Sequence, residues 1–428
     1  MVNHMNASII EKALLEQLDE LEGMRGDVLI HRPEEDRINL QSKLAQVVIG
    51  VRRSGKSTLC FNALEKAGVK YAYANFDDDR LEGLTSDDLD KVLELLYKIY
   101  GKFDHLFLDE IQNVEGWHLF VNRLLRQKLH IVVTGSNSKL LSGELASHLT
   151  GRHHKIELFP FSFADWCKYN GVETERLTTK NRGLIQGEFA RYMKQGGFPE
   201  LLSETDRKDY IDTLFDNIIS QDIKRRFNVR NVDALKKMAT NLLDTAPSFI
   251  VKENLQKDFD IKSDHTVNKY LSYLTQTYLV STLSKYSTKS RERIRNEKAY
   301  AIDVAFMDKR QDAFSGPNMG FRLETIVYLE LRRRCARHGF DLYYFNNGSA
   351  EADFVVCDGN KTQAVYQVTF TLEGEKTRSR EIRGAVAGTR GTKPAMTYII
   401  TDHDDEVTLN VDGCTIYVVP VWKWLIEE

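Results

Sequence analysis

The residues whose types and spacing most clearly indicate chemistry lie at 50–57, where the sequence GVRRSGKS fits the pattern G-x-x-x-x-G-K-[ST]. Glycines at the two fixed places let the backbone fold so that successive N–H groups point at phosphate oxygens, at the positive end of the following helix. Lys56 is expected to reach the β- and γ-phosphates, and the Ser57 hydroxyl to bind Mg²⁺. The segment therefore predicts a site for the phosphate tail of a nucleotide.

The neighbouring loop residues complete this predicted nucleotide-binding segment. We expect contact with the nucleotide from eight positions: Gly50, Arg52, Arg53, Ser54, Gly55, Lys56, Ser57 and Thr58. For Arg52 and Arg53 two interpretations are equally supported, because a basic side chain here either holds phosphate or forms a solvated loop surface. The sequence Asn-Lys-x-Asp, which recognises guanine, does not occur in the chain, so we expect ATP with Mg²⁺.

A pair of acidic residues, Asp109 and Glu110, ends the largely apolar run 103–108. If that run is a parallel strand beside the phosphate loop, Asp109 lies where it can hold the Mg²⁺ shell, usually through water. Glu110 is then the natural general base, which polarises the water that attacks the γ-phosphoryl group. The alternative is that both carboxylates cap a following helix, but the loop upstream favours the catalytic interpretation.

Two small polar residues, Ser136 and Asn137, follow a third apolar run at 130–135. One of them is expected to lie near the γ-phosphate or the attacking water, and the sequence does not separate the two. Their alternative role is to cap a helix over 138–149.

An arginine near the γ-phosphate often stabilises the transition-state charge in nucleotide hydrolysis. Arg152, in the sequence Thr-Gly-Arg after the predicted helix, is the first candidate, and Arg191 and the cluster 224–226 are weaker ones. A surface ion pair is the alternative for each. The sequence does not show whether such an arginine acts within its own chain or across a subunit boundary.

The elements that must position these residues form an α/β pattern. The apolar run 47–49 predicts a buried parallel strand that leads into the loop, and a helix follows the loop. A second strand is predicted at 69–74 and a helix near 86–100, before the strand that ends at Asp109. This extra strand separates the Asp109 strand from the loop strand and places the 130–135 strand between them.

The chain resembles a widespread family of bacterial and archaeal AAA-type ATPases in the segments GVRRSGKST, LFLDEIQNVEGW, VVTGSNSKLL, and LTGR followed by ELFPFSF. The resemblance extends through nearly the whole chain. Proteins of this family carry a C-terminal domain of unknown function, and their biological role is mostly unassigned. The resemblance implies ATP binding and hydrolysis on a five-stranded parallel sheet, in a P-loop ATPase domain over 1–160.

Three further parts are predicted after this domain: a helical lid over 161–230, a winged-helix domain over 231–310 and an α/β domain over 311–428. The lid contains the break Gly-Gly-Phe-Pro at 196–199, which is either a hinge or a plain helix stop. The predicted winged helix has helices that open near 231, 251 and 263, and strands at 279–283 and 299–302. This order resembles a variant of the helix-turn-helix motif.

The predicted wing tip, residues 285–298, is locally basic, with a net charge of +4. Its basic residues are Lys285, Lys289, Arg291, Arg293, Arg295 and Lys298, and its acidic residues are Glu292 and Glu297. This charge favours contact with DNA phosphates, with His265 and Lys269 as candidate groove residues. Contact with a protein partner is the equally supported alternative.

The last segment contains acidic residues in an order that resembles the restriction-endonuclease-like core. Glu324 opens a helix, Glu351 and Asp353 start a strand, and Gln367 lies on the next strand. In that core, two carboxylates bind Mg²⁺ and a lysine assists the attacking water. Here Thr369 stands where the lysine is expected and Gln367 where the paired acid is expected. We therefore expect a domain of this fold that has lost catalysis, with at most a vestigial metal site.

Composition sets the remaining limits. Of 428 residues, 42% are hydrophobic and 28% are charged, a globular balance that argues against long disorder. The formal net charge of −3 means that nucleic-acid contact requires a local basic patch. The 5 cysteines are far apart with no CxxC pair, which fits neither a zinc site nor a disulfide framework and indicates a reducing compartment. Apolar runs are short and no signal peptide is visible, so we expect a cytoplasmic protein without membrane contact.

Three hypotheses of function follow. The leading one is an ATPase whose nucleotide state sets the posture of the winged helix and the nuclease-like tail toward DNA or a protein partner. The second is an ATP-dependent nuclease in defence against foreign DNA. The third is an interaction protein that binds ATP only as a structural ligand and does not hydrolyse it. An oligomer is compatible with each.

Overall fold

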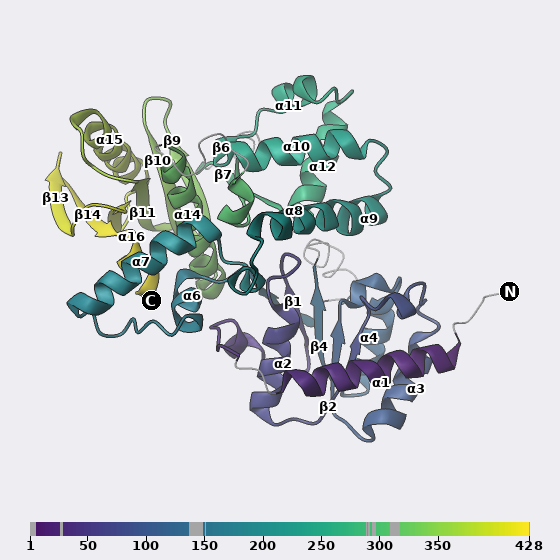
Figure 1. Cartoon of the computed structure of the whole chain (residues 1–428). Helices are drawn as coiled ribbons and strands as arrows, with labels where there is room; N and C mark the ends of the chain where they lie inside the picture. Colours follow the sequence, from purple (N-terminus) through teal and green to yellow (C-terminus); the bar gives the residue numbers. More distant parts are fainter. Residues whose placement is uncertain are drawn as a thin grey trace. The chain divides into compact units, whose positions relative to one another are not determined.

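The computed structural model describes residues 6–25, 29–136, 149, 151–287, 289, 292, 297–308 and 317–427. The chain divides into two compact units, Met1–Leu158 and Phe159–Glu428 (Figure 1). The end of the first unit lies close to the predicted end of the ATPase domain at residue 160. The three parts expected after it, over 161–230, 231–310 and 311–428, all lie in the second compact unit, and their division stays a prediction.

The first unit is built on a parallel sheet with the strand order β2-β3-β4-β1-β5. Its strands are β1 Ala45–Ile49, β2 Tyr71–Asn75, β3 His105–Asp109, β4 His130–Gly135 and β5 His153–Glu157. Every neighbouring pair is parallel. The predicted five-stranded parallel sheet is confirmed, and β4 lies between the loop strand β1 and the carboxylate strand β3.

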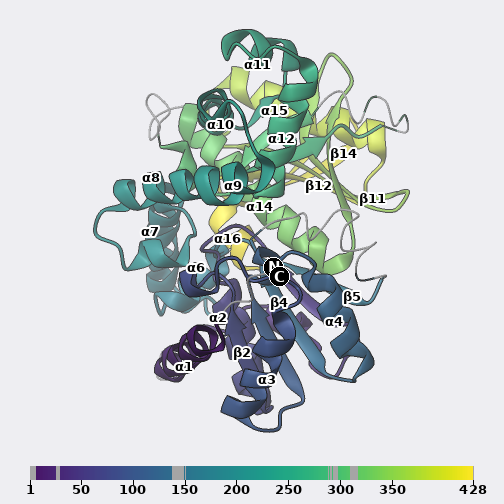
Figure 2. The same ribbon diagram turned by 90° about the vertical axis from the view of Figure 1, so that its right-hand side faces the viewer.

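Helices connect these strands and cover both faces of the sheet. They are α1 Ala7–Met24, α2 Lys56–Ala67, α3 Leu89–Tyr100 and α4 Trp117–Arg126, with 3-10 turns at Glu35–Arg37, Asp79–Leu81 and Ile111–Asn113. In the strand order β2-β3-β4-β1-β5, the chain moves toward the β2 edge when it passes from β1 to β2. It moves toward the β5 edge when it passes from β3 to β4. Right-handed crossovers therefore place α2 and α4 on opposite faces, as Figure 2 shows.

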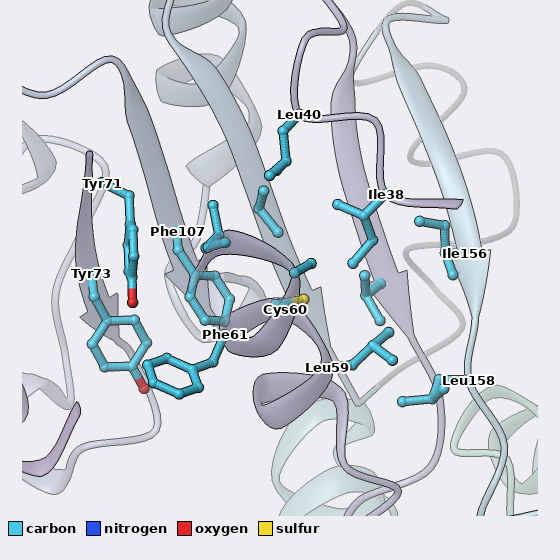
Figure 3. Close-up of a cluster of buried hydrophobic side chains, with 14 of the residues drawn as sticks. Ile38, Leu40, Leu59, Cys60, Phe61, Tyr71, Tyr73, Phe107, Ile156 and Leu158 are labelled. Carbon is cyan, nitrogen blue, oxygen red and sulfur yellow. The ribbon is translucent and has the colours of Figure 1, made fainter. Parts of the chain in front are cut away.

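A hydrophobic core holds α2 against its face of the sheet (Figure 3). Leu59 and Leu64 of α2 belong to one buried cluster with Val48, Phe107 and Val132, which come from three neighbouring strands. Because side chains alternate between the two faces of a strand, every second strand residue reaches this cluster. Burial of apolar surface stabilises the folded state by about 25 cal/mol per Å². The packing of α2 on the sheet holds the first residues of this helix at the carboxyl edge.

The second unit begins with helices, as expected for 161–230. These are α6 Phe163–Tyr169, α7 Thr179–Gln195, α8 Arg207–Asn217 and α9 Arg225–Phe227, with a 3-10 turn at Pro199–Leu202 and a π-helix at Ile218–Lys224.

The Gly-Gly-Phe-Pro break is a packed turn within this unit. The N–H of Gly197 donates to the buried carboxylate of Asp303 at 2.8 Å, and its carbonyl accepts from the N–H of Phe161 at 2.7 Å. A Cβ on Gly196 would lie 1.9 Å from Asp303 Oδ1, and one on Gly197 would lie 2.4 Å from the carbonyl oxygen of Phe161. Of the two interpretations of this sequence, the structure favours the helix stop.

Residues 232–301 contain the three expected helices and the expected pair of strands. The elements are α10 Val232–Thr245, β6 Ser248–Phe249, α11 Lys252–Asp258, α12 Asp264–Gln276, β7 Val280–Ser284 and β8 Glu297–Ala301. The strands form an antiparallel sheet in the order β6-β8-β7. The sequence did not indicate β6, because two residues are too few to show an alternating pattern.

The last part of the chain forms a six-stranded sheet with the order β13-β14-β12-β11-β10-β9. Its elements are a 3-10 turn Val304–Met307, α14 Pro317–His338, β9 Asp341–Asn346, β10 Glu351–Asp358, β11 Lys361–Thr369, α15 Glu375–Thr392, β12 Met396–Thr401, β13 Val407–Val411, β14 Cys414–Pro420 and α16 Val421–Ile426. The strand β10 is antiparallel to both β9 and β11, β12 is parallel to both β11 and β14, and β13 is antiparallel to β14.

Helices cover both faces of this sheet (Figure 1). A Cβ on Gly388 of α15 would lie 2.9 Å from Val365 of β11, so α15 covers the face to which Val365 points. The next residue, Tyr366, packs its ring against Trp424 of α16. Because neighbouring strand residues point to opposite faces, α15 and α16 lie on opposite sides of the sheet.

Candidate functional site

The phosphate loop, the acidic pair and Ser136 lie at the carboxyl edge of the first unit's sheet. Ile49 pairs with Gly135, and Leu108 pairs with Val133. Since these strands are parallel, the residues that follow each strand meet at one edge, which is the usual place for a ligand in such sheets. The structure thus brings together the segments that the sequence singled out separately.

Two glycines allow the path of the loop. A Cβ on Gly50 would lie 2.0 Å from the carbonyl oxygen of Leu158, where no side-chain atom fits. Gly55 directly precedes α2 and has a φ of 90°, in a region where residues with a side chain are strained. The structure therefore explains why glycine is required at both fixed positions of the pattern. The loop leads directly into the first turn of α2, whose N–H groups have no partner within the helix and can bind an anion.

The side chain of Lys56 is buried inside the loop. Its ammonium lies 3.2 Å from the carbonyl oxygen of Val51 and 3.4 Å from Oε1 of Glu110. The positive charge expected to bind phosphate therefore lies between the loop and the end of the carboxylate strand.

The carboxylate of Asp109 is buried and accepts hydrogen bonds from several hydroxyl groups. Ser57 donates to Oδ1 at 3.0 Å, Tyr73 donates to Oδ2 at 3.2 Å, and the Thr134 hydroxyl also donates to Oδ1. Burial and the neighbouring charge of Glu110 raise the pKa of Asp109, whereas the hydrogen bonds from Thr134 and Ser57 lower it. The two residues expected to bind Mg²⁺, Ser57 and Asp109, are in direct contact.

Glu110 is held by both its backbone and its side chain. Its φ of 50° lies in the left-handed region, which is unusual for a residue with a side chain. Its N–H donates to the Thr134 hydroxyl at 2.9 Å, and its Oε2 accepts from the N–H of Ser136 at 3.1 Å and from the Gln112 amide. The carboxylate therefore points toward the end of β4 and toward Lys56.

Three residues of this site were missed by sequence reasoning: Thr134, Tyr73 and Arg32. The guanidinium of Arg32 is buried and donates to the carbonyl oxygen of Ser54 at 3.2 Å, so it supports the loop from outside the motif. Thr134 could have been noticed as a hydroxyl near the end of a buried strand. Tyr73 and Arg32 carry no such signal, because only the folded chain brings them to the loop.

The remaining predicted loop residues have different surroundings. Arg52 forms an ion pair with Asp77 at 3.0 Å, whereas Arg53 is exposed and has a φ of 68°. Thr58 lies in the first turn of α2. Ser136 is buried and contacts Glu110 through its backbone. Asn137 lies outside the described residues.

Comparison with known proteins places this site in a family. Residues 42–167 match a family model described as an AAA domain, and residues 186–312 match one described as a domain of unknown function, DUF8612. The uncharacterized protein MJ1544 of Methanocaldococcus jannaschii is 33% identical over 435 residues, which cover 98% of this chain and 96% of that protein. The chain belongs to the same family as MJ1544. Its first unit has the fold of a P-loop NTPase, and residues 42–167 are its AAA domain.

Further similarities are weaker. An uncharacterized protein of Haemophilus influenzae is 29% identical over 341 residues, 76% of this chain and 82% of that protein. The solved structures include the replication initiator DnaA bound to AMPPCP and single-stranded DNA, with 17% identity, a TM-score of 0.26 and coverage of 63% of this chain and 92% of that one. The Thermotoga maritima RuvB Holliday junction branch migration motor has 16% identity, a TM-score of 0.28 and coverage of 65% and 89%. Scores this low carry no further information about this chain.

Arg152 lies at the edge of the first unit's sheet that is opposite the phosphate loop. It is exposed and directly precedes β5, whose first residue His153 pairs with Ala45 at the start of β1. The phosphate loop follows the end of β1, about 13 Å away at roughly 3.3 Å per strand residue. The backbone of Arg152 is therefore distant from the loop of its own chain, and a role for Arg152 at a nucleotide stays a prediction. Arg191, a weaker candidate, is paired with Glu188 at 2.7 Å.

One basic residue of the predicted wing tip, Lys298, does not lie on the surface as expected. Lys298 is buried rather than exposed, and it forms ion pairs with Glu351 and, at 3.8 Å, with Glu324. Lys289 pairs with Glu292 at 3.5 Å. Three other basic residues of the predicted tip lie outside the described residues: Arg291, Arg293 and Arg295. The count of six wing cations was therefore too high by at least one.

The acidic residues of the C-terminal part come together around Lys298. Tyr300 donates to Oε1 of Glu324 at 2.8 Å, and Asp353 accepts from the N–H of Val368 at 2.7 Å. Gln367 turns to another acid and donates to Glu381 at 2.7 Å. Among the residues described above, no group of three or more His, Cys, Asp or Glu side chains is arranged to hold a metal ion.

A lysine from β8 therefore supplies the positive charge that the sequence of β11 lacks at Thr369. The sequence pattern places no cation at this position of β11, and the cation that contacts the cluster comes from a strand outside the motif. Burial and the charge of Glu324 raise the pKa of Asp353, and Lys298 lowers it. Burial opposes the charge on Lys298, but the carboxylates of Glu324, Asp353 and Glu351 raise its pKa above the ordinary value.

No helix of the described residues is both long and apolar enough to cross a membrane.

Proposed function

We propose that this protein binds Mg-ATP at residues 50–58 and hydrolyses it. The observation that carries the proposal is the contact between the Ser57 hydroxyl and the Asp109 carboxylate, with the Lys56 ammonium and the Glu110 carboxylate beside them. Hydroxyl and carboxylate oxygens are the ligands that Mg²⁺ prefers. When bound there, Mg²⁺ would neutralise charge on the phosphates.

Each side chain has a distinct role in this proposal. Lys56 binds the β- and γ-phosphates in exchange for its contact with the Val51 carbonyl. Glu110 accepts a proton from the attacking water, for which a carboxylate within hydrogen-bonding reach is suited. Thr134 orients both acidic residues, because its hydroxyl bonds to the Asp109 side chain and to the Glu110 backbone.

Two substitutions test the proposal. Lys56→Ala should weaken nucleotide binding about 10- to 100-fold, as expected when a charged hydrogen-bonding group worth about 1.5–3 kcal/mol is lost. Glu110→Gln should keep binding but lower turnover about 10²- to 10⁴-fold. Binding of a fluorescent ATP analogue and release of phosphate measure the two effects. Lys66→Ala, an exposed lysine of the same helix, is the control. Unchanged ATPase rates in the first two variants would reject the proposal.

We further propose that the nucleotide state sets the posture of the second unit toward DNA or a protein partner. Its support is the order of elements: three helices and a strand ribbon at 232–301, which fit a winged helix, followed by α14, β9, β10, β11, α15 and β12, which fit a restriction-endonuclease-like core. A partner responds to nucleotide only if it binds one posture better than the other. If the purified protein instead retains unhydrolysed ATP with no turnover, ATP is a structural ligand.

An ATP-dependent nuclease is the second candidate, because Lys298 places an ammonium among the carboxylates of Glu324 and Glu351. Incubation of supercoiled plasmid with ATP and Mg²⁺ or Mn²⁺ tests it. Nicking that disappears in Asp353→Asn would support this function, and the absence of any nicking that depends on Asp353 removes it.

A further inference from the structure

The helix α15 exposes a strongly basic surface in a chain whose net charge is negative. Five of its residues are basic and exposed: Lys376, Arg378, Arg380, Arg383 and Arg390. Only one exposed residue of this helix, Glu375, is acidic, because its other acid, Glu381, is buried. The carboxylate of Glu381 forms an ion pair with Arg380 and accepts a hydrogen bond from the Gln367 amide. The sequence motifs considered above did not include this helix.

A groove of about 900 Å³ runs beside this helix. Its floor includes the apolar side chains of Ile382 and Val386 on α15. Its lining also includes Phe345 of β9, Asn347 of the turn between β9 and β10, and Asp412 of the turn between β13 and β14. The groove lies wholly within the second unit and is described throughout.

Three arginines line the groove: Arg378, Arg383 and Arg390. Arg390 donates to the carbonyl oxygen of Asp412 at 2.9 Å and lies 3.5 Å from its carboxylate. Across the described part of the chain, the guanidinium groups of Arg378 and Arg383 form no ion pair or hydrogen bond. Two guanidinium forks are therefore available to an external anion, and their planar donors match phosphate oxygens well.

The spacing of these arginines favours a regular polyanion. At a rise of 1.5 Å per helical residue, Arg378 and Arg383 are about 7.5 Å apart along the axis, and Arg383 and Arg390 about 10.5 Å. Phosphates recur regularly along a nucleic-acid strand, one per roughly 3.4 Å of duplex axis, so arginines several ångströms apart can each meet a phosphate of the same strand. In an extended acidic peptide the side chains on one side of the strand also repeat, at about 6.4–6.8 Å, so polyglutamate is the competing ligand in the test below.

We propose that the groove beside α15 binds the phosphate backbone of a nucleic acid. The proposal rests on DNA as a partner of the proposed ATPase and assigns that contact to α15 rather than to the wing tip. Lys298 of the predicted wing tip is buried against Glu324 and Glu351, whereas Arg378 and Arg383 of α15 are exposed. Contact of this kind is independent of base sequence and depends strongly on salt.

The test is DNA binding by the double variant Arg378→Glu/Arg383→Glu of the full chain. Fluorescence anisotropy with a labelled 20-nucleotide strand and the matching duplex, at 50 and 200 mM salt, measures affinity. We expect at least 10-fold weaker binding at 50 mM salt, with a salt slope smaller by about two, one for each lost phosphate contact. The control Lys43→Glu/Lys102→Glu makes the same charge change at two exposed lysines of the first unit and should bind as the parent does.

Several outcomes would overturn the proposal. It fails if the parent protein binds neither form of DNA at 50 mM salt, or if the α15 variant binds as tightly as the control. It also fails if polyglutamate displaces the labelled DNA at a lower charge concentration than unlabelled DNA does, since an acidic protein would then be the better ligand. Arg378→Gln/Arg383→Gln, with the same melting temperature as the parent, excludes misfolding as the cause of lost binding.

ATPase activity is measured in the same proteins, so that this inference and the proposed ATPase can fail separately. Loss of DNA binding in the variant while the parent shows no ATPase activity supports the groove and contradicts the ATPase. Normal ATPase activity with undiminished DNA binding in the variant supports the ATPase and contradicts the groove.

Discussion

At the scale of single residues, the hydroxyl of Thr134 forms hydrogen bonds with both acidic residues of the site, Asp109 and Glu110. It donates to the carboxylate of Asp109 and accepts from the N–H of Glu110. Thr134→Val removes both bonds with little change of shape, at a cost of about 1–3 kcal/mol, while Asp109 keeps its bonds from Ser57 and Tyr73. We expect a drop of that size in the free energy of unfolding and about a 10-fold lower kcat, measured by urea denaturation and phosphate release. Thr134→Ser should recover most of both, and a valine variant with parental kcat would contradict the role.

Gly50 is the residue whose replacement the loop tolerates least. In Gly50→Ala the new Cβ would collide with the carbonyl oxygen of Leu158. Leu158 cannot easily move away, because its N–H donates a hydrogen bond to the carbonyl oxygen of Ile49. We expect loss of nucleotide binding and a lower melting temperature. Gly23→Ala is the matched control, because nothing lies within 4 Å of its Cβ. That change should leave binding intact and stabilise α1 by about 0.5–1 kcal/mol. Equal melting temperatures in the two variants would contradict the prediction.

At the scale of elements, Lys298 ties the strand β8 to the C-terminal sheet. Lys298→Met would leave the half-buried carboxylates of Glu324 and Glu351 without their cation, and because both keep some contact with solvent we expect a cost below the about 3–5 kcal/mol of a fully buried pair. Burial already raises the pKa of Glu324, and Lys298 lowers it, so the pKa should rise further in the variant. A folded-state pKa above the unfolded value makes stability fall as pH rises through that range.

We therefore expect Lys298→Met to be least stable near pH 8 and to regain stability toward pH 5, whereas the exposed Lys361→Met should unfold as the parent does. Urea denaturation at several pH values gives the comparison. A loss of stability that does not change with pH would show that packing of the lysine stem, rather than its charge, holds the cluster together.

The elements that could be predicted are those whose signal is local. A short apolar run before a glycine pattern specifies β1, the loop and α2, and the order of strands follows from one extra strand between the loop and Asp109. The errors concern residues whose position depends on distant parts of the chain. Lys298 has the sequence context of an exposed wing, and only its pairing with Glu324 and Glu351 shows that it is buried. The sequence also does not show on which edge Arg152 lies, and the parallel register of β5 with β1 places it at the edge opposite the phosphate loop.

At the scale of the whole molecule, the proposed function requires that nucleotide and DNA influence each other's binding. If ATP shifts the second unit toward the posture that binds DNA, the affinity for DNA changes by some factor, and thermodynamic linkage requires DNA to change the affinity for ATP by the same factor. A coupling of about 1–3 kcal/mol, typical of such systems, corresponds to roughly 5- to 150-fold. The residues that bind DNA need not touch the phosphate loop for this coupling to exist.

Glu110→Gln allows both halves of this cycle to be measured, because ATP should remain intact during the titration. We expect the dissociation constant for a labelled 20-nucleotide duplex to differ at least 5-fold between saturating ATP and no nucleotide, and that for a fluorescent ATP analogue to differ by the same factor with and without duplex. Adding Lys56→Ala should shift the ATP concentration at which the difference appears about 10- to 100-fold upward, since this change weakens nucleotide binding rather than DNA contact. Equal dissociation constants in all states would show that the two units work independently, and the ATPase would then act on a partner other than DNA.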